Sequence, residues 1–566
     1  MNKSARYKGL VRLAIALTTI AMVVFLSNIF YLRFDLTSEK RYTLQDITKR
    51  TLKDLNDAIY IKVYLDGDLP IGLNRMKKAL TETLDEFRVI AGKNIQYEFI
   101  NPSESANTKE RQKVYNQLYE KGLQPTNIQQ NDKEGGSSQK LVFPGLIMSY
   151  AGREVPVNLL KNIPGLSADE NINLSIQNFE FALVDGLMKL TTETRHKIAF
   201  IQGHGEFDEF QTGDIEKALS EYYDIDRVAI RGNIDALKPF QTVIIAGTNL
   251  PMPEVDKIAI DQFVMNGGRV LWFIDPVQVS IDSLSKGAST LAFVNQHNLD
   301  DMLFRYGARL NPMLIQDLQC AVIPVNMALA GQEPKFVPAP WVYYPLLAAP
   351  TNHPVTRNLN LIHSQFASPV DTVGGSSAIK KQYLLYTSMN GKVLQVPLFV
   401  SLSQVNQRIN EREFRISNIP VAVELSGEFQ SVFRNRPLSG YNNGQPFEFK
   451  DKSAFTRMIV VADADIIRND VQRRPNGAYI IPLGYDRFTN QTFGNKELVM
   501  NMVRYLNDDE GLMNLRSRDF KLRLLDRKAI LQSRLKWQLI NMLIPSAILV
   551  IGGFVWLYVR RRKYTR

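Results

Sequence analysis

The densest group of chemically capable side chains, His204, Glu206 and Asp208, follows directly after an apolar run. Glycines at 203 and 205 flank the histidine, and glycine lets the backbone come close to a ligand. A histidine beside a carboxylate is suited to a general base or a metal ligand. The alternative is a tight turn that holds a hydrogen-bonded histidine. None of the other four histidines pairs with His204 at metal-ligand spacing, so we expect no metal.

Further carboxylates follow other predicted strands. Asp275 comes after the apolar run 271–274, and Asp463 and Asp465 come after 458–461. Ligands of parallel α/β sheets bind at the carboxyl ends of the strands, where such side chains could meet in one cleft. Helix capping and turn closure are the alternatives. The candidate ligand or partner site therefore comprises His204, Glu206, Asp208, Asp275, Asp463 and Asp465.

Standard catalytic signatures are absent. The chain has no Gly-x-x-x-x-Gly-Lys-Ser/Thr, so it forms no P-loop and supplies no ATPase, and Gly-x-Ser-x-Gly and His-Glu-x-x-His are also missing. The single cysteine, Cys320, rules out an internal disulfide and a cysteine-rich metal site. We expect a non-enzymatic chain without a cofactor. A hydrolase or carbohydrate-acting enzyme that uses His204 with Glu206 or Asp463 is the rival, and a passive scaffold is a third possibility.

Two α/β units must position these side chains. In the first, residues 35–165, apolar positions Leu73, Met76, Leu80, Leu84 and Phe87 recur every three or four residues and predict one helix face, while 58–65, 95–100, 142–150 and 155–159 read as strands. The second unit, residues 170–510, opens with a helix at 170–191. It then alternates strands with helices, which favours a mainly parallel sheet covered on both faces. Residues 277–450 are expected to form an insertion with its own strands.

Uncharged stretches mark both ends of the chain. Residues 13–32 and 537–559 each offer enough apolar residues to cross a hydrocarbon core of about 30 Å as a helix. The sequence therefore predicts a cytoplasmic tail at 1–12, a first span at 13–32, a second span at 537–559 and a tail at 560–566. A basic juxtamembrane helix at 511–536 is expected to lead into the second span.

The net charge of +11 is concentrated near the membrane segments. Ten of the 68 basic residues lie in the two tails and at Arg33, which leaves 58 basic against 57 acidic residues for positions 34–536. A near-neutral body disfavours nucleic acid. Short basic tails stay in the cytoplasm, so we expect both termini inside and the body outside. Anionic lipids or an acidic partner are expected to contact the basic stretch, namely Arg516, Arg518, Lys521, Arg523, Arg527, Lys528, Arg534 and Lys536.

Ordered motifs along nearly the whole chain resemble one known family. They are KRYTL at 40–44, VYLDGDLP at 63–70, GHGE at 203–206, DQFVMNGG at 261–268, DDMLFRYG at 300–307, NKEL at 495–498, LLDR at 524–527 and RRKY at 561–564. In these motifs the sequence resembles the gliding-motility ABC-transporter auxiliary proteins (GldG) of Bacteroidetes.

The resemblance implies a subunit of the inner membrane that works with a multi-span permease and a separate ATPase, with its large domain in the periplasm. It also implies an amidotransferase-like fold for the central domain. That fold's catalytic cysteine has no counterpart here, because Cys320 does not lie in a strand-to-helix elbow, and so amidotransferase activity is not expected.

Overall fold

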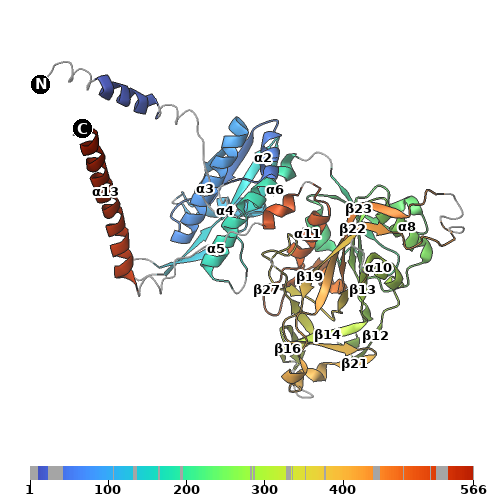
Figure 1. Cartoon of the computed structure of the whole chain (residues 1–566). Coiled ribbons are helices and arrows are strands. Elements are labelled where there is room, and N and C mark those ends of the chain that lie inside the picture. Colours follow the sequence, from blue (N-terminus) through green and yellow to red (C-terminus); the bar gives the residue numbers. More distant parts are fainter. Residues whose placement is uncertain are drawn as a thin grey trace. The chain divides into compact units, whose positions relative to one another are not determined.

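The structure is a computed structural model that describes residues 11–22, 24, 43–105, 107–131, 137–163, 166–191, 195–280, 283–284, 287, 289–326, 333, 335–350, 352–374, 378–437, 441, 447–475, 477–509, 511–517 and 533–564. Residues 43–518 belong to one compact unit, and residues 519–566 belong to another. The first unit contains a smaller α/β module, formed by residues 43–191 with 512–517, and a larger one, formed by residues 195–509. Figure 1 traces these elements in sequence colours.

The first module is built on a four-stranded sheet in the order β2-β1-β5-β6. Strand β1 (Ile59–Val63) runs parallel to β2 (Ile95–Phe99) and antiparallel to β5 (Gly145–Tyr150), which forms a hairpin with β6 (Arg153–Asn158). The turn of this hairpin is at Ala151 and Gly152, and both residues have positive φ. A separate hairpin pairs β3 (Thr126–Asn131) with β4 (Ser137–Val142).

Helices cover this sheet with apolar faces. The five positions predicted to share a helix face are the buried residues of α3 (Ile71–Ala91). The other helices of the module are α2 (Asp46–Lys53), α4 (Thr108–Glu120), α5 (Ala168–Gln177) and α6 (Phe179–Thr191). Residues 170–191, predicted to open the second domain, lie in α5 and α6, which pack in the core of the first module. The reason is that α6 is apolar on several faces and contributes Phe179, Leu183 and Leu187 to that core.

The second module contains a seven-stranded sheet in the order β19-β22-β23-β10-β9-β7-β8. Parallel pairing joins β7 (Lys197–Ile201), β8 (Asp224–Val228), β9 (Thr242–Ala246), β10 (Arg269–Phe273) and β23 (Lys452–Val461). Two antiparallel strands, β22 (Pro420–Gln430) and β19 (Ile379–Tyr386), complete it. Both arise inside the predicted insertion at 277–450, so that segment is in part an extension of the main sheet.

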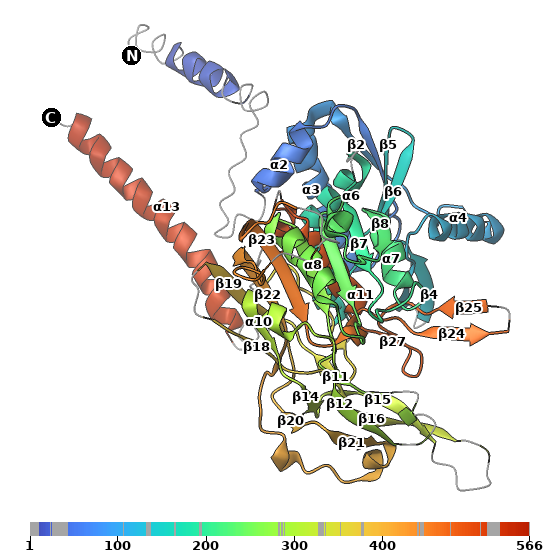
Figure 2. The ribbon, with the colours of Figure 1, turned by 90° about the vertical axis from the view of Figure 1, so that its right-hand side faces the viewer.

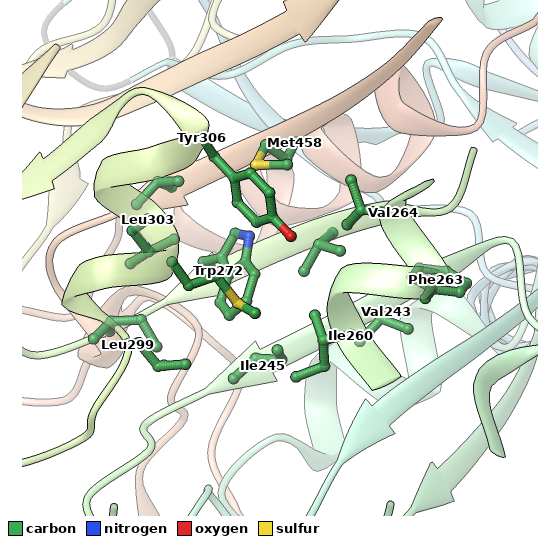
Figure 3. Packing of buried hydrophobic residues seen from close by; sticks show 14 of the residues in the cluster. Val243, Ile245, Ile260, Phe263, Val264, Trp272, Leu299, Leu303, Tyr306 and Met458 are labelled. Carbon is green, nitrogen blue, oxygen red and sulfur yellow. The ribbon is translucent and has the colours of Figure 1, made fainter. Parts of the chain in front are cut away.

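Alternating side chains of these strands contribute to two apolar layers, one on each face of the sheet. Val243, Ile245 and Trp272 face the layer that contains α8 (Glu254–Met265) and α10 (Asp300–Tyr306), as Figure 3 shows. The intervening Ile244 and Leu271 face the layer that contains α7 (Gly213–Leu219) and α11 (Asn495–Leu506). Successive strand residues point to opposite faces, so a nearly continuous apolar run such as β9 predicts the two-sided burial that is found here.

The remainder of the 277–450 segment forms small sheets around their own apolar cluster (Figure 2). These sheets pair β11 (Val277–Gln278) with β12 (Ser289–Val294) and β21 (Leu398–Ser401), β14 (Met313–Asp317) with β20 (Gly391–Gln395), and β15 (Cys320–Asn326) with β16 (Phe336–Leu347) and β17 (Ile362–His363). Strand β13 (Ala308–Leu310) pairs with β18 (Val370–Thr372), and two short hairpins pair β24 (Val471–Arg474) with β25 (Gly477–Ile480) and β26 (Tyr485–Asp486) with β27 (Gln491–Thr492).

One helix in the described part of the chain is long and apolar enough to cross a membrane. It is α13 (Arg534–Tyr564), which contains the predicted second span. The predicted first span is described only as the short apolar helix Val11–Met22, and most of its remaining residues lie outside the described ones. A continuous juxtamembrane helix from 511 is not formed, because 512–517 is the short 3-10 helix η7 (Leu512–Ser517) with buried Met513 and Leu515.

Candidate functional site

The glycine-flanked loop after β7 holds its histidine in a closed set of hydrogen bonds. Nδ1 of His204 lies 3.0 Å from Oε1 of Glu206, and Nε2 lies 2.8 Å from Oδ2 of Asp256 in α8. Glu206 also accepts the backbone N–H of His204 at 2.7 Å, and Asp256 accepts that of Gly232 at 2.5 Å. Both ring nitrogens are therefore occupied, and neither is free for a substrate or a metal ion.

The local backbone makes this arrangement possible. Gly203 and Gly205 have φ values of 122° and 80°, which glycine adopts without strain. A Cβ atom at Gly205 would lie 1.8 Å from Oδ1 of Asn249. The carbonyl of His204 also accepts the backbone N–H groups of Asn249 and Leu250, so the loop is fixed to the segment after β9.

Electrostatics favour a charged imidazolium at His204 and an ionised Glu206. Burial opposes the charged imidazolium, but the hydrogen bonds to Glu206 and Asp256 outweigh burial and raise the pKa of His204. Burial likewise opposes ionisation of Glu206, yet the bonds from His204 lower the pKa of that carboxyl. With 5% of its surface exposed, His204 is an internal cross-link between two segments of the fold. We call His204, Glu206 and Asp256 the histidine clamp.

Asp208 has a structural role as well. Its Oδ1 accepts the backbone N–H groups of Phe210 at 3.0 Å and Gln211 at 2.9 Å, which closes the turn before α7. Such a turn is a common use of aspartate near a helix start.

The three remaining carboxylates of the candidate set do meet. Oδ1 of Asp275, after β10, accepts the backbone N–H of Ala464 at 2.6 Å, next to Asp463 and Asp465 after β23. Asp463 is fully buried and accepts the N–H groups of Gln365 and Asp465, both at 2.9 Å. Burial and the charge of Asp465 raise the pKa of Asp275 to about 7, and the same two causes raise the pKa of Asp463. The strand ends thus converge here, but without His204.

One member of this carboxylate cluster faces a cavity of about 390 Å³. Asp465 lines the cavity together with Arg468, whose Nη1 is 2.9 Å from Oδ1 of Asp465, without hydrogen-bond geometry. Tyr344 and His363 form part of the wall and make an edge-on ring contact with each other. Asp275, Asp463 and the histidine clamp do not line it.

Arg516, predicted to contact the membrane surface or a partner, is instead buried inside the body with 7% of its surface exposed. Its guanidinium donates to the carbonyl of Arg357 at 3.0 Å, to Glu497 at 3.3 Å and to Oδ1 of Asn501. Glu497 also pairs with Lys161 of the first module. A polar node of Arg516, Glu497 and Lys161 therefore joins the two modules. The charge pattern predicted an exposed Arg516, but acceptors from segments far apart in sequence surround its guanidinium and bury it.

The other basic positions of that stretch fall into two groups. Arg534 and Lys536 lie in the first turn of α13. The predictions for Arg518, Lys521, Arg523, Arg527 and Lys528 fall outside the described residues.

Sequence reasoning missed the partners that define these sites. Asp256 and Glu497 occupy ordinary helix positions, and no local pattern links them to His204 or Arg516. Arg468 was detectable, because its spacing of three residues from Asp465 suits an ion pair within one turn.

Comparison with known proteins supplies the family. The family described as an ABC-type uncharacterized transport system matches residues 195–502, which is more than half of the chain. The chain belongs to this family. Membership gives it an accessory role in ABC transport in association with transporter components, and the family suggests a subunit without catalysis. With the apolar helix α13, it also indicates membrane association.

Other comparisons add little about function. Residues 38–149, which include β1, β2 and nearly all of β5 in the first module's sheet but not β6, match a domain of unknown function, DUF7088. No curated protein matches the chain. Among solved structures, a chain titled mmIFT52 N-terminal domain aligns with 56% of this chain and 98% of its own length, at 11% identity and a TM-score of 0.32.

Proposed function

We propose that this protein is a non-enzymatic auxiliary subunit of a gliding-motility ABC transporter in the inner membrane. In this proposal two spans hold a periplasmic body, both termini are cytoplasmic, and a permease and a separate ATPase are its partners. The observation that carries the proposal is the family match over residues 195–502. The motifs quoted above direct it toward gliding motility, and the absence of a P-loop from the sequence requires an ATPase on another chain.

The histidine clamp supports a role without catalysis. A general base needs a nitrogen within reach of the proton that it removes. Both nitrogens of His204 are committed to buried carboxylates, and the ring lies inside the fold. The enzyme alternative thus loses the residue on which it was built.

The polar node supports mechanical coupling. Arg516 is bonded to both the α11 region and the loop near Arg357, and through Glu497 it reaches the first module. The chain continues from this node toward α13 in sequence, so a force on the membrane helix would reach both modules through Arg516. We propose ligand contact at the cavity lined by Asp465 and Arg468, because Asp465 is the one member of the candidate set that lines it.

Co-purification tests the proposal most directly. The full chain, solubilised in mild detergent from cells that glide, should bring down a permease and an ATPase. Repeated recovery of the chain alone at full yield would reject the transporter subunit. An Arg516→Met variant should keep its partners but reduce gliding at equal protein level, whereas Arg153→Met, at an exposed arginine of β6, should glide normally.

Orientation needs a separate experiment. Alkaline phosphatase inserted at the exposed Ala151–Gly152 turn should be active, because that enzyme requires the periplasm. An inactive fusion in a stable, membrane-associated protein would place the body in the cytoplasm.

A further inference from the structure

We propose that a groove beside α10 binds an acidic, extended peptide segment of a partner protein. The groove has a volume of about 920 Å³ and lies between α10, β13, the start of β19 and the segment 432–436. It is separate from the candidate site residues, none of which lines it. We call it the α10 groove.

Three cations of the groove have charges that no carboxylate of the described residues neutralises. Arg305 reaches only the neutral side-chain amide of Gln430, at 3.3 Å. Lys381 donates to two backbone carbonyls, those of Val373 and Gly374. Arg309 forms no ion pair in this part of the structure, although it is opposite Asp371 in the β13–β18 pairing. Side chains from three separate segments thus place uncompensated positive charge on one concave surface.

The acidic side chains of the groove do not fully cancel this charge. Asp301 is paired with Lys257 at 2.6 Å and with Arg436 at 3.4 Å, so these two cations neutralise its charge. Asp300 lies 3.9 Å from Nε2 of His297, but burial lowers the pKa of that histidine, so Asp300 offsets one of the three positive charges. The balance that remains favours an anionic ligand.

A buried amide forms part of the groove wall. Asn295, 4% exposed, lines the groove, and its Nδ2 donates to the carbonyls of Thr248 at 3.1 Å and Asp275 at 2.8 Å. These two acceptors fix the orientation of the amide. Its Oδ1 is then left buried without a partner. A buried acceptor without a donor costs free energy, so this part of the groove wall is polar and not fully satisfied.

The apolar wall fits a peptide better than a small ion. Phe304 is 55% exposed and Val294 is 40% exposed, and both line the groove. Acidic side chains alternating with apolar ones would place carboxylates on Arg305 and Arg309 and apolar groups on Phe304. This inference does not depend on the transporter role, since peptide binding and co-purification are measured separately.

Fluorescence anisotropy of the full chain in detergent micelles tests the groove. The probe is a labelled peptide that alternates Glu with Leu, and the control peptide carries Gln in place of Glu. Arg305→Ala with Arg309→Ala should weaken binding by about three- to tenfold, and raising the salt concentration should weaken it further. Arg305→Glu with Arg309→Glu should weaken it more, while Arg153→Ala should bind like the wild type.

Several results would overturn the proposal. Equal affinity of the wild type and both double variants, with unchanged thermal midpoints, would remove the groove as the binding surface. Equal affinity for the Gln peptide would remove the charge argument. Displacement of the peptide by pyrophosphate or by anionic lipid vesicles at matched charge concentration would identify a phosphate or membrane site instead.

Discussion

Replacing Arg516 with methionine should loosen the junction of the two modules. Methionine keeps much of the apolar stem but removes the guanidinium that joins Glu497, Asn501 and the carbonyl of Arg357. Burial opposes ionisation of Glu497. The charges of Lys161 and Arg516 outweigh burial and lower the pKa of Glu497 in the folded protein. The variant therefore leaves an ionised carboxylate with one cation instead of two.

The expected loss follows from this geometry. Breaking a fully buried ion pair costs about 3–5 kcal/mol. The Glu497 side chain is 35% exposed and keeps Lys161, so we place the loss of unfolding free energy at about 2 kcal/mol. One kcal/mol shifts the midpoint of a domain of 150–250 residues by about 2–4 °C, and the larger body here lowers the expected shift to about 4 °C.

Thermal unfolding of the full chain in detergent, followed by circular dichroism, measures this shift. Arg153→Met is the matched control, because Arg153 is exposed on β6. Glu497→Gln combined with Arg516→Met should lower the midpoint by less than the sum of the two single changes, since both remove the same ion pair. An Arg516→Met midpoint equal to that of the wild type would refute the buried node.

Three further predictions concern the strand-end residues. His204→Gln should lower the free energy of unfolding by about 3 kcal/mol, because Glu206 and Asp256 stay buried without the imidazolium, and a midpoint unchanged in thermal unfolding would contradict the clamp. The pKa of His204 is raised in the folded protein, so the stabilisation by its charged form is complete below about pH 6.5 and is lost as the pH rises through the folded pKa. In urea titrations, the unfolding free energy of the wild type should therefore fall over this pH range, and that of His204→Gln should not. The pKa of Asp275 is about 7 in the folded protein, so its ionisation lowers stability as the pH rises. The unfolding free energy of Asp275→Asn should exceed that of the wild type by on the order of 1–3 kcal/mol at about pH 8 and equal it near pH 4. A difference that does not depend on pH would count against this. Gly205→Ala should destabilise the loop by about 1–3 kcal/mol through its positive φ and the contact with Asn249, with a lower midpoint and less soluble protein as the readout.

The sequence by itself determined the parts that depend on local pattern. Apolar spacing predicted the buried face of α3, and the apolar runs before His204 and Asp275 predicted β7 and β10, because a helix or strand buries one periodic set of side chains wherever it packs. The uncharged run near the C-terminus predicted α13 for a similar reason, since length and composition decide whether a helix is apolar enough for a membrane.

Only the tertiary structure decided which polar groups meet. Asp275 joins Asp463 and Asp465, as strand order suggested, but His204 pairs with Asp256 of a helix 52 residues along the chain. Arg516 is buried and does not lie at the predicted membrane surface, because Glu497, Asn501 and the carbonyl of Arg357 surround its guanidinium. Such pairings depend on how whole elements pack, and a buried charge accepts whichever partners that packing brings within hydrogen-bond distance.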